Sequence, residues 1–159
     1  MSIGSVDQYG FPVAPKPARP AARTGAGLLM AGGAIHIIAV FLPWYQGNGV
    51  DTLKGMDSFF TVDGNGYIDA PGKVWLVVGG LLFALGLATF IAGRILTVAI
   101  AAAVVSVIGL FGAILGFGVV KNERDAQHVG DVAFGVIVGT LAIFAALAGS
   151  IQVLAKRRR

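Results

Sequence analysis

The sequence contains no cysteine and very little charge. Without cysteine the chain can form no disulfide, no thiolate metal site and no cysteine nucleophile. Only 13% of the 159 residues are charged, whereas soluble domains carry about a quarter. Two histidines are too few for a three-histidine metal site within one chain. This composition leaves little of the chain for a water-facing domain and predicts a single membrane domain.

Recognisable catalytic motifs are missing as well. The sequence has no GxSxG, HExxH or GxxxxGK[ST] pattern, and no carboxylate lies within its apolar stretches. The missing carboxylates argue against an ion-coupled transporter. We therefore expect a protein that is not an enzyme and that has no catalytic residues, cofactor or metal. A loose calcium site at Asp63, Asn65 and Asp69 stays open as an alternative.

What the sequence does have is four long stretches without Asp, Glu, Lys or Arg. Each supplies roughly the 20 apolar residues that a helix needs to cross a bilayer. We predict spans at about residues 25–42, 74–93, 95–120 and 132–155. The fold class is then an all-α membrane protein, a four-transmembrane-helix bundle within residues 25–155. Three aromatic residues near the span ends are typical of headgroup-level anchors: Trp44, Tyr45 and Trp75.

The connecting segments differ strongly in length and character. The segment 46–72 is rich in Gly and Asp, and "SFFTVDGNGYI" within it predicts two short strands around a tight turn. Gly93 and Arg94 leave almost no loop between the second and third spans. The Pro/Ala-rich residues 1–24 predict a disordered tail, and residues 156–159 form a short basic tail.

The charges outside the spans predict the orientation in the membrane. The two tails and Arg94 carry eight basic residues against the single acid Asp7, while the other two loops carry four basic residues against seven acids. Positive charge in short segments marks the cytoplasmic side. We therefore expect a multi-pass protein of the inner (plasma) membrane with both termini cytoplasmic. The same rule explains the terminal KRRR, so nucleic acid is not an expected partner.

Glycine gives the strongest signal inside the spans. Small residues recur at alternating steps of four and three, which keeps them on one face of a helix and lets helix backbones approach closely in lipid. The helix-packing candidates are Gly79, Gly86, Gly109, Gly112, Gly116, Gly135, Gly139 and Gly149. The simplest interpretation is packing within the bundle. The alternative is that one stripe faces another membrane protein or a second copy of the chain.

His36 is the only ionisable residue inside a span, which by default makes it a functional-site hypothesis. A single hydrogen bond to a neighbouring helix would satisfy a neutral histidine, and Thr89, Ser106 and Thr140 are the candidate partners. A structural histidine is therefore the leading interpretation. A proton or partner contact and haem ligation are the alternatives.

The order of parts also carries a resemblance. A first span ending in "FLPW", a loop with "DGNGYI" and a Gly-rich helical hairpin resemble small four-span membrane proteins of actinobacteria and their phages, most of which have no assigned function. The resemblance supplies no catalytic residues. We expect a non-enzymatic accessory subunit or regulator of a larger envelope complex. The alternatives are an oligomeric small-molecule channel or transporter, and a phage-encoded protein acting in exclusion or lysis.

Overall fold

Four long helices dominate the structure. The computed structural model describes residues 20–47, 52–60, 67–93, 95–127 and 130–155. The helices are α1 (Pro20–Phe41), α2 (Gly72–Ala92), α3 (Leu96–Gln127) and α4 (Phe134–Ala155). All four are long and apolar enough to cross a membrane. The predicted fold class, an all-α bundle of four membrane-spanning helices, is therefore confirmed.

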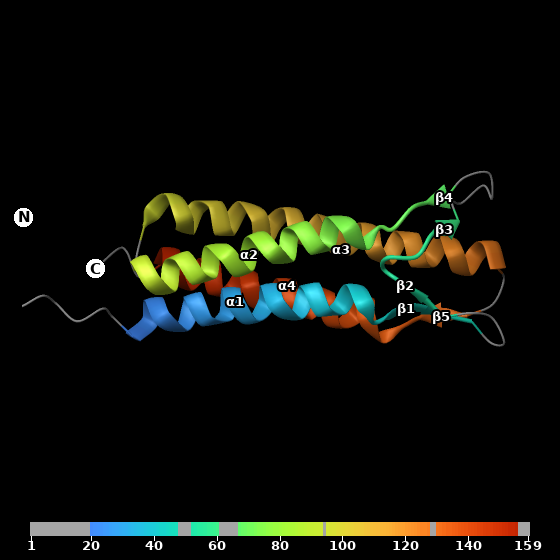
Figure 1. Ribbon diagram of the computed structural model, residues 1–159, viewed down its shortest axis with the longest axis horizontal. Coiled ribbons are helices and arrows are strands. Elements are labelled where there is room, and N and C mark those ends of the chain that lie inside the picture. Colours follow the sequence, from blue (N-terminus) through green and yellow to red (C-terminus); the bar gives the residue numbers. More distant parts are fainter. Residues whose placement is uncertain (1–19, 48–51, 61–66, 94, 128–129, 156–159) are drawn as a thin grey trace, which may run out of the picture.

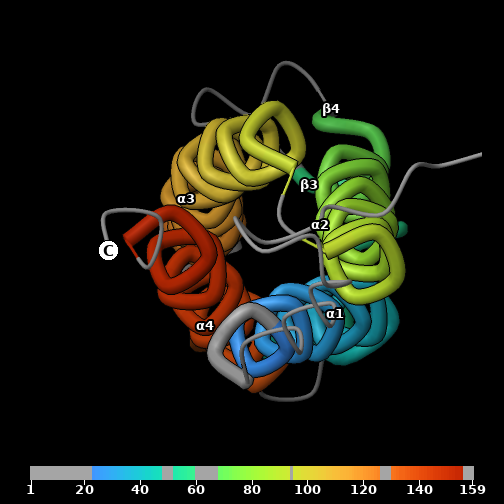
Figure 2. Tube along the Cα trace, turned by 90° about the vertical axis from the view of Figure 1, so that its left-hand side faces the viewer, coloured from blue at the N-terminus to red at the C-terminus, as the bar shows by residue number. Residues whose placement is uncertain are grey.

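The helices run alternately up and down and surround a common axis in chain order, so that α1 lies between α2 and α4 (Figures 1 and 2). The start of α1, the end of α4 and the α2–α3 connection share one end of the bundle, which we call the terminal end (Figure 1). The strands lie at the opposite end, the sheet end. Only residues 93–95 separate α2 from α3, as the near-absence of a loop predicted, and Gly93 closes α2 at φ +76°.

Two helices extend beyond their predicted spans by five residues or more. The α1 helix begins at Pro20 instead of Gly25, because proline fits the first helical position, where no backbone donor is needed. The predicted disordered tail is therefore wrong for residues 20–24, and residues 1–19 and 156–159 lie outside the described part of the chain. The α3 helix has 32 residues and is about 48 Å long, well over the roughly 30 Å of a bilayer core.

Short strands cover the sheet end. The strands β3 (Phe59–Phe60) and β4 (Tyr67–Ile68) pair antiparallel, which confirms the predicted hairpin. A three-stranded sheet that the sequence did not predict has the order β2 (Leu53–Lys54), β1 (Pro43–Gln46), β5 (Asp131–Val132). Tyr45 of β1 pairs with Val132 of β5. This pairing joins the α1–α2 connection to the α3–α4 connection.

The core has two parts along the bundle. Near the sheet end, large aromatic residues pack against valines, and further along the axis aliphatic residues and alanines fill the space between the helices. The outer surface of the helices is also apolar: Ile91, Phe111 and Leu115 are each more than 60% exposed. A helix that is apolar on all sides is typical of a membrane span. The protein is thus a multi-pass membrane protein by fold and surface.

Candidate functional site

His36 lies on the inner face of α1 and is completely buried. Its imidazole Nδ1–H donates a hydrogen bond to the carbonyl oxygen of Gly139 on α4 at 3.0 Å, and this geometry puts the ring hydrogen on Nδ1 because a carbonyl can only accept. Among the residues that the structure describes, no hydrogen-bond partner reaches the buried Nε2. One polar atom of His36 therefore holds two helices together, and the other lies unpaired in an apolar environment.

Trp75 links His36 to the two remaining helices. Its ring stacks on the imidazole, with the centroids 4.4 Å apart and the planes inclined by 13°. The indole Nε1–H donates to the carbonyl oxygen of Gly112 on α3 at 3.1 Å. Because Trp75 belongs to α2, one continuous set of contacts connects all four helices. We call His36, Trp75, Gly112 and Gly139 the His–Trp clamp.

Trp44 and Phe59 extend the clamp toward the sheet end. The rings of Trp44 and Trp75 lie 4.4 Å apart, and those of Trp44 and Phe59 lie 6.3 Å apart. The Trp44 indole N–H donates to the carbonyl oxygen of Ala39 at 2.9 Å. Buried indole groups usually find such partners, and tilted aromatic pairs at these distances are stabilising. The aromatic cluster therefore fills the bundle interior at the level where the helices meet the strands.

The hydroxyl partners predicted for His36 are wrong. Thr89, Ser106 and Thr140 each donate to the carbonyl oxygen four residues earlier in their own helix. In lipid this local bond is always within reach of a helical Ser or Thr, whereas a hydroxyl on another helix must lie at the right height. The predicted single bond from His36 to a neighbouring helix exists, but a backbone carbonyl accepts it.

The eight predicted packing glycines all face other elements. A Cβ atom placed on any of them would lie within 4 Å of a neighbouring helix or strand: Gly79 and Gly86 face α1; Gly109 faces α2 and α4; Gly112 and Gly116 face Trp75; Gly135 faces the residues around Pro43; Gly139 faces Trp75; Gly149 faces α1. These positions agree with packing inside the bundle. The glycine faces identified from the sequence spacing are therefore covered by neighbouring helices and strands of the same chain.

The three aromatic residues predicted as interface anchors are not at the surface. Trp44 and Tyr45 are 0% exposed and Trp75 is 2% exposed. Both indole N–H groups are bonded within the protein instead of facing lipid headgroups. The anchor prediction is wrong because β1 packs against α3 and α4, so that Trp44 and Tyr45 belong to the same core cluster as Trp75.

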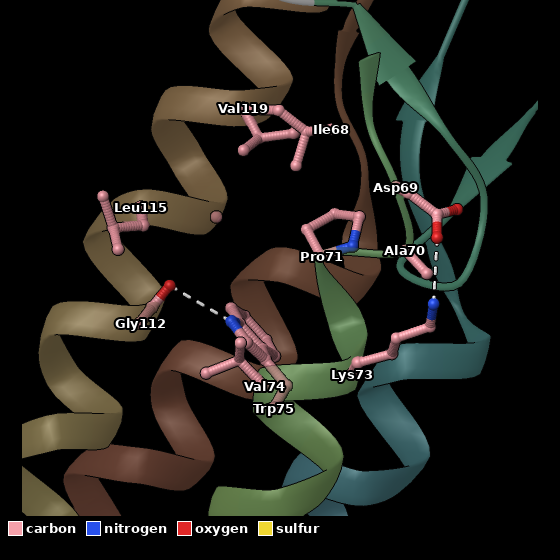
Figure 3. A pocket seen from close by; sticks show the side chains of 11 residues that line it. Ile68, Asp69, Ala70, Pro71, Lys73, Val74, Trp75, Gly112, Leu115 and Val119 are labelled. Atoms are coloured by element: carbon pink, nitrogen blue, oxygen red, sulfur yellow. Dashed lines mark hydrogen bonds and ion pairs between the residues drawn. The ribbon is translucent and has the colours of Figure 1, made fainter.

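A groove of about 440 Å³ lies between α2 and α3 near the sheet end (Figure 3). Trp75 and Gly112 meet at its base, where their hydrogen bond is drawn, and the segment 68–71 borders it on the side of the strands. Most of the lining is apolar. The exceptions are Asp69 and Lys73, which form an ion pair of 2.9 Å at the rim.

Charged groups at the sheet end differ in their environments. Both partners of the Lys73–Asp69 pair are exposed, and the hydrogen bond and charge of Lys73 lower the pKa of Asp69. Glu123, in the last turns of α3, is only 2% exposed, in contrast to the exposed Lys73–Asp69 pair. Burial, with a smaller contribution from the charge of Glu123, raises the pKa of Tyr45.

Of the three residues suggested as calcium ligands, the structure describes Asp69. Asp63 and Asn65 lie outside the described residues, and Asp69 accepts bonds from Lys73 and Ser58. Within the described ranges, no three His, Asp or Glu side chains gather as metal ligands would.

Three glycines of α1 that were not among the predicted packing positions also face neighbouring helices. Gly25, Gly32 and Gly33 press directly on α4 and α2: a Cβ at Gly32 would lie 2.7 Å from the carbonyl oxygen of Ala142, and one at Gly33 would lie 2.6 Å from the backbone nitrogen of Phe83. Together with His36 they form the inner face of α1. The spacing of seven between Gly25 and Gly32, followed by four to His36, is the signal that could have identified this face.

Comparisons with known proteins add no relative to this picture. No family model, no curated protein and no solved structure matches the chain.

Proposed function

We propose that the protein is a non-enzymatic subunit of the plasma membrane that binds another membrane protein, as an accessory component or regulator of a larger envelope complex. The observation that carries this proposal is the His–Trp clamp. In the clamp, the stacked rings of His36 and Trp75 fill the bundle interior, and their hydrogen bonds to Gly139 and Gly112 connect all four helices. A protein whose interior is filled in this way acts through its outer surface.

The buried polar groups support the same view. A conduit for solutes needs a continuous series of polar groups or water along its axis. Here the hydroxyls of Thr89 and Ser106 bond to their own helices. The aromatic rings of Trp44 and Trp75 pack against each other in the core, and Trp75 stacks on His36. Within the described residues, His36 Nε2 is the buried side-chain atom left without a hydrogen bond. The interior is therefore better suited to rigidity than to transport.

The surface best suited to a partner helix is the outer face of α2. Gly80, Ala84 and Ala88 follow each other at steps of four, and a Cβ at Gly80 would have no atom within 4 Å. Close approach of backbones at small residues is the main way in which helices associate in lipid. The inward glycines Gly79 and Gly86 already serve α1, so this second stripe is available to another protein.

We place the sheet end outside the cell and both termini in the cytoplasm. In the sequence, the basic tails precede α1 and follow α4, Arg94 separates α2 from α3, and the acidic segments connect the helices that meet at the sheet end. A reporter enzyme that is active only in the cytoplasm, fused after Arg159, should be active. Activity of a periplasmic reporter at the same position would contradict this orientation.

The binding surface can be tested with a photo-crosslinking amino acid at exposed helix positions in native membranes. Leu81 and Leu87 flank the α2 stripe, and Phe111 and Ile114 lie on the exposed face of α3. We expect one distinct protein adduct from the α2 positions and none of that mass from the α3 positions. Equal labelling from both helices, or adducts with lipid alone, would contradict the proposal.

A matched pair of variants separates binding from folding. Gly80→Leu and Gly118→Leu both change a glycine at which an added Cβ atom would meet no atom within 4 Å. Both variants should therefore fold. The first should lose the partner in mild-detergent copurification, and the second should retain it. If both retain it, the α2 stripe is not the binding surface.

A second candidate function, an oligomeric small-molecule channel, is favoured by the unpaired Nε2 of His36. Solute flux into liposomes that carry the purified protein, lost on His36→Phe, would support it. Absence of flux from correctly inserted protein would exclude it.

A further inference from the structure

Two positions on α3 that lack side chains, Gly112 and Gly116, line the groove between α2 and α3. Gly112 and Gly116 lie one helical turn apart and face Trp75. Trp75 cannot swing outward to fill the space, because it is bonded to the Gly112 carbonyl and stacked on His36. The volume of about 440 Å³ lies within the range of roughly 300–1,000 Å³ that is typical of sites for small ligands.

The groove opens toward the surface that faces lipid. Val74 and Leu115 stand on either side of it, and they are 57% and 69% exposed. Along α3 the groove extends from Val119 to Gly112, which corresponds to about 10 Å at the helical rise per residue. An apolar chain lying in the bilayer can therefore enter it sideways without crossing water.

The rim of the groove is charged. Asp69 and Lys73 form their ion pair where α2 begins, at Gly72, and Figure 3 shows the pair beside Pro71. Since the apolar span of α2 also begins there, we expect this pair to lie at the level of the lipid headgroups. An ammonium group has three donors, so Lys73 can hold Asp69 and a phosphate oxygen together. Asp69 can likewise accept from a headgroup amine.

We propose that this groove binds one membrane phospholipid with an amine-bearing, zwitterionic headgroup. One acyl chain occupies the apolar groove over Trp75 and Gly112. The phosphate contacts Lys73, and the headgroup amine contacts Asp69. Charge complementarity selects this occupant, because a cation and an anion side by side match a phosphate and an amine better than they match an anionic or uncharged headgroup. The proposal depends on membrane insertion and does not depend on the α2 partner.

The test uses the full-length protein in vesicles that contain phosphatidylethanolamine with a photoreactive acyl chain. After irradiation, the labelled residues are mapped by mass spectrometry. We expect adducts concentrated on the residues that border the groove, above all Val74 and Leu115. Unlabelled phosphatidylethanolamine should compete more strongly than phosphatidylglycerol. Adducts spread evenly over the exposed faces of all four helices would overturn the proposal.

Two matched pairs of variants test the acyl-chain and headgroup contacts separately. Leu115→Trp blocks the groove, whereas Ile114→Trp places the same ring on a neighbouring residue that is 60% exposed and does not line the groove. We expect the first variant to lose groove adducts and the second to keep them. Equal labelling of the two would overturn the acyl-chain assignment.

For the headgroup, Lys73→Gln is compared with Lys54→Gln, which removes an exposed lysine at the same end of the bundle. Loss of one hydrogen bond to a charged group should weaken competition by unlabelled phosphatidylethanolamine about tenfold in the first variant and leave it unchanged in the second. An unchanged lipid preference in Lys73→Gln would overturn the headgroup assignment. Adducts with a protein at the groove instead of with lipid would show that another helix occupies it.

Discussion

Replacing Gly139 by alanine is the sharpest test of the His–Trp clamp. An alanine Cβ at this position would collide with Cζ3 of Trp75 and would lie 2.8 Å from Cε3 and 3.0 Å from Cη2 of the same ring. Trp75 has little room to retreat, because His36 lies on one side, Trp44 lies 4.4 Å away and Gly112 accepts its indole hydrogen. A single methyl group should therefore disturb contacts among all four helices.

The magnitude follows from the contacts that must give way. Forcing a methyl group into a packed core costs about 1–3 kcal/mol. Losing the indole hydrogen bond to Gly112 costs about 0.5–1.5 kcal/mol, and weakening the aromatic stack costs a similar amount. Alanine recovers about 1 kcal/mol of helix propensity relative to glycine. We expect Gly139→Ala to lower the free energy of unfolding by about 2–4 kcal/mol.

The assay is reversible unfolding of the purified protein in mixed micelles, by titration with a denaturing detergent and circular dichroism. Gly80→Ala is the control, because its Cβ meets no atom within 4 Å and the variant should be as stable as the wild type or slightly more stable. Trp75→Phe shortens the ring that faces Gly139, so the penalty of Gly139→Ala should shrink in that background. A stability of Gly139→Ala equal to that of the control, or a penalty independent of residue 75, would refute the clamp as described.

Three further predictions concern single groups. His36→Phe should change the free energy of unfolding by no more than about 1 kcal/mol. The substitution removes a stabilising hydrogen bond to Gly139, but it also removes the destabilising unpaired Nε2, so the two effects largely cancel. A loss of several kcal/mol in the same detergent titration would contradict this cancellation. The pKa of Tyr45 is raised, so the neutral phenol is favoured in the folded state, and its stabilising effect is full below pH 10 and is lost as the pH rises toward the folded pKa. Ultraviolet titration should therefore show a late tyrosinate step that Tyr45→Phe removes. Lys73 lowers the pKa of Asp69, so the stability gained from this pair is present at neutral pH and is lost as the pH falls through the lowered pKa. Asp69→Asn should therefore slightly reduce the loss of unfolding free energy at acidic pH. An unchanged dependence of stability on pH would argue against the pair.

The helices could be predicted from the sequence because their signal is local. Length and absence of charge define a span without reference to any other part of the chain, and all four predicted spans lie largely within observed helices. The hairpin of β3 and β4 was equally accessible, since its strands flank a Gly-rich turn within a few residues. The glycine spacing also identified the inward faces of α2, α3 and α4.

The site could not be predicted because it depends on contacts between distant residues. His36 and Gly139 are 103 residues apart, and a backbone carbonyl as acceptor has no signature in the sequence. Trp44, Tyr45 and Trp75 were misread because tryptophan and tyrosine near a span end are compatible with both a headgroup belt and a core. For Trp44 and Tyr45 the difference lies in β5, a strand of two residues that pairs with β1 from the other loop. No local pattern marks so short a strand.

The way the glycines are used changes where function should be sought. Many of the small residues that recur at helix-packing spacing lie in the contacts of α1 with α2 and α4. The α2–α3 contact near the sheet end differs. There Gly112 and Gly116 face the ring of Trp75, which stacks on His36, and an open groove lies between the two helices. The clamp therefore has two effects: it joins the four helices, and it fixes Trp75 in the wall of the groove. A substitution of His36 is therefore expected to act first by moving Trp75. Its effect on the Trp75 position must be known before a direct role in proton transfer or ligand binding is assigned to the imidazole.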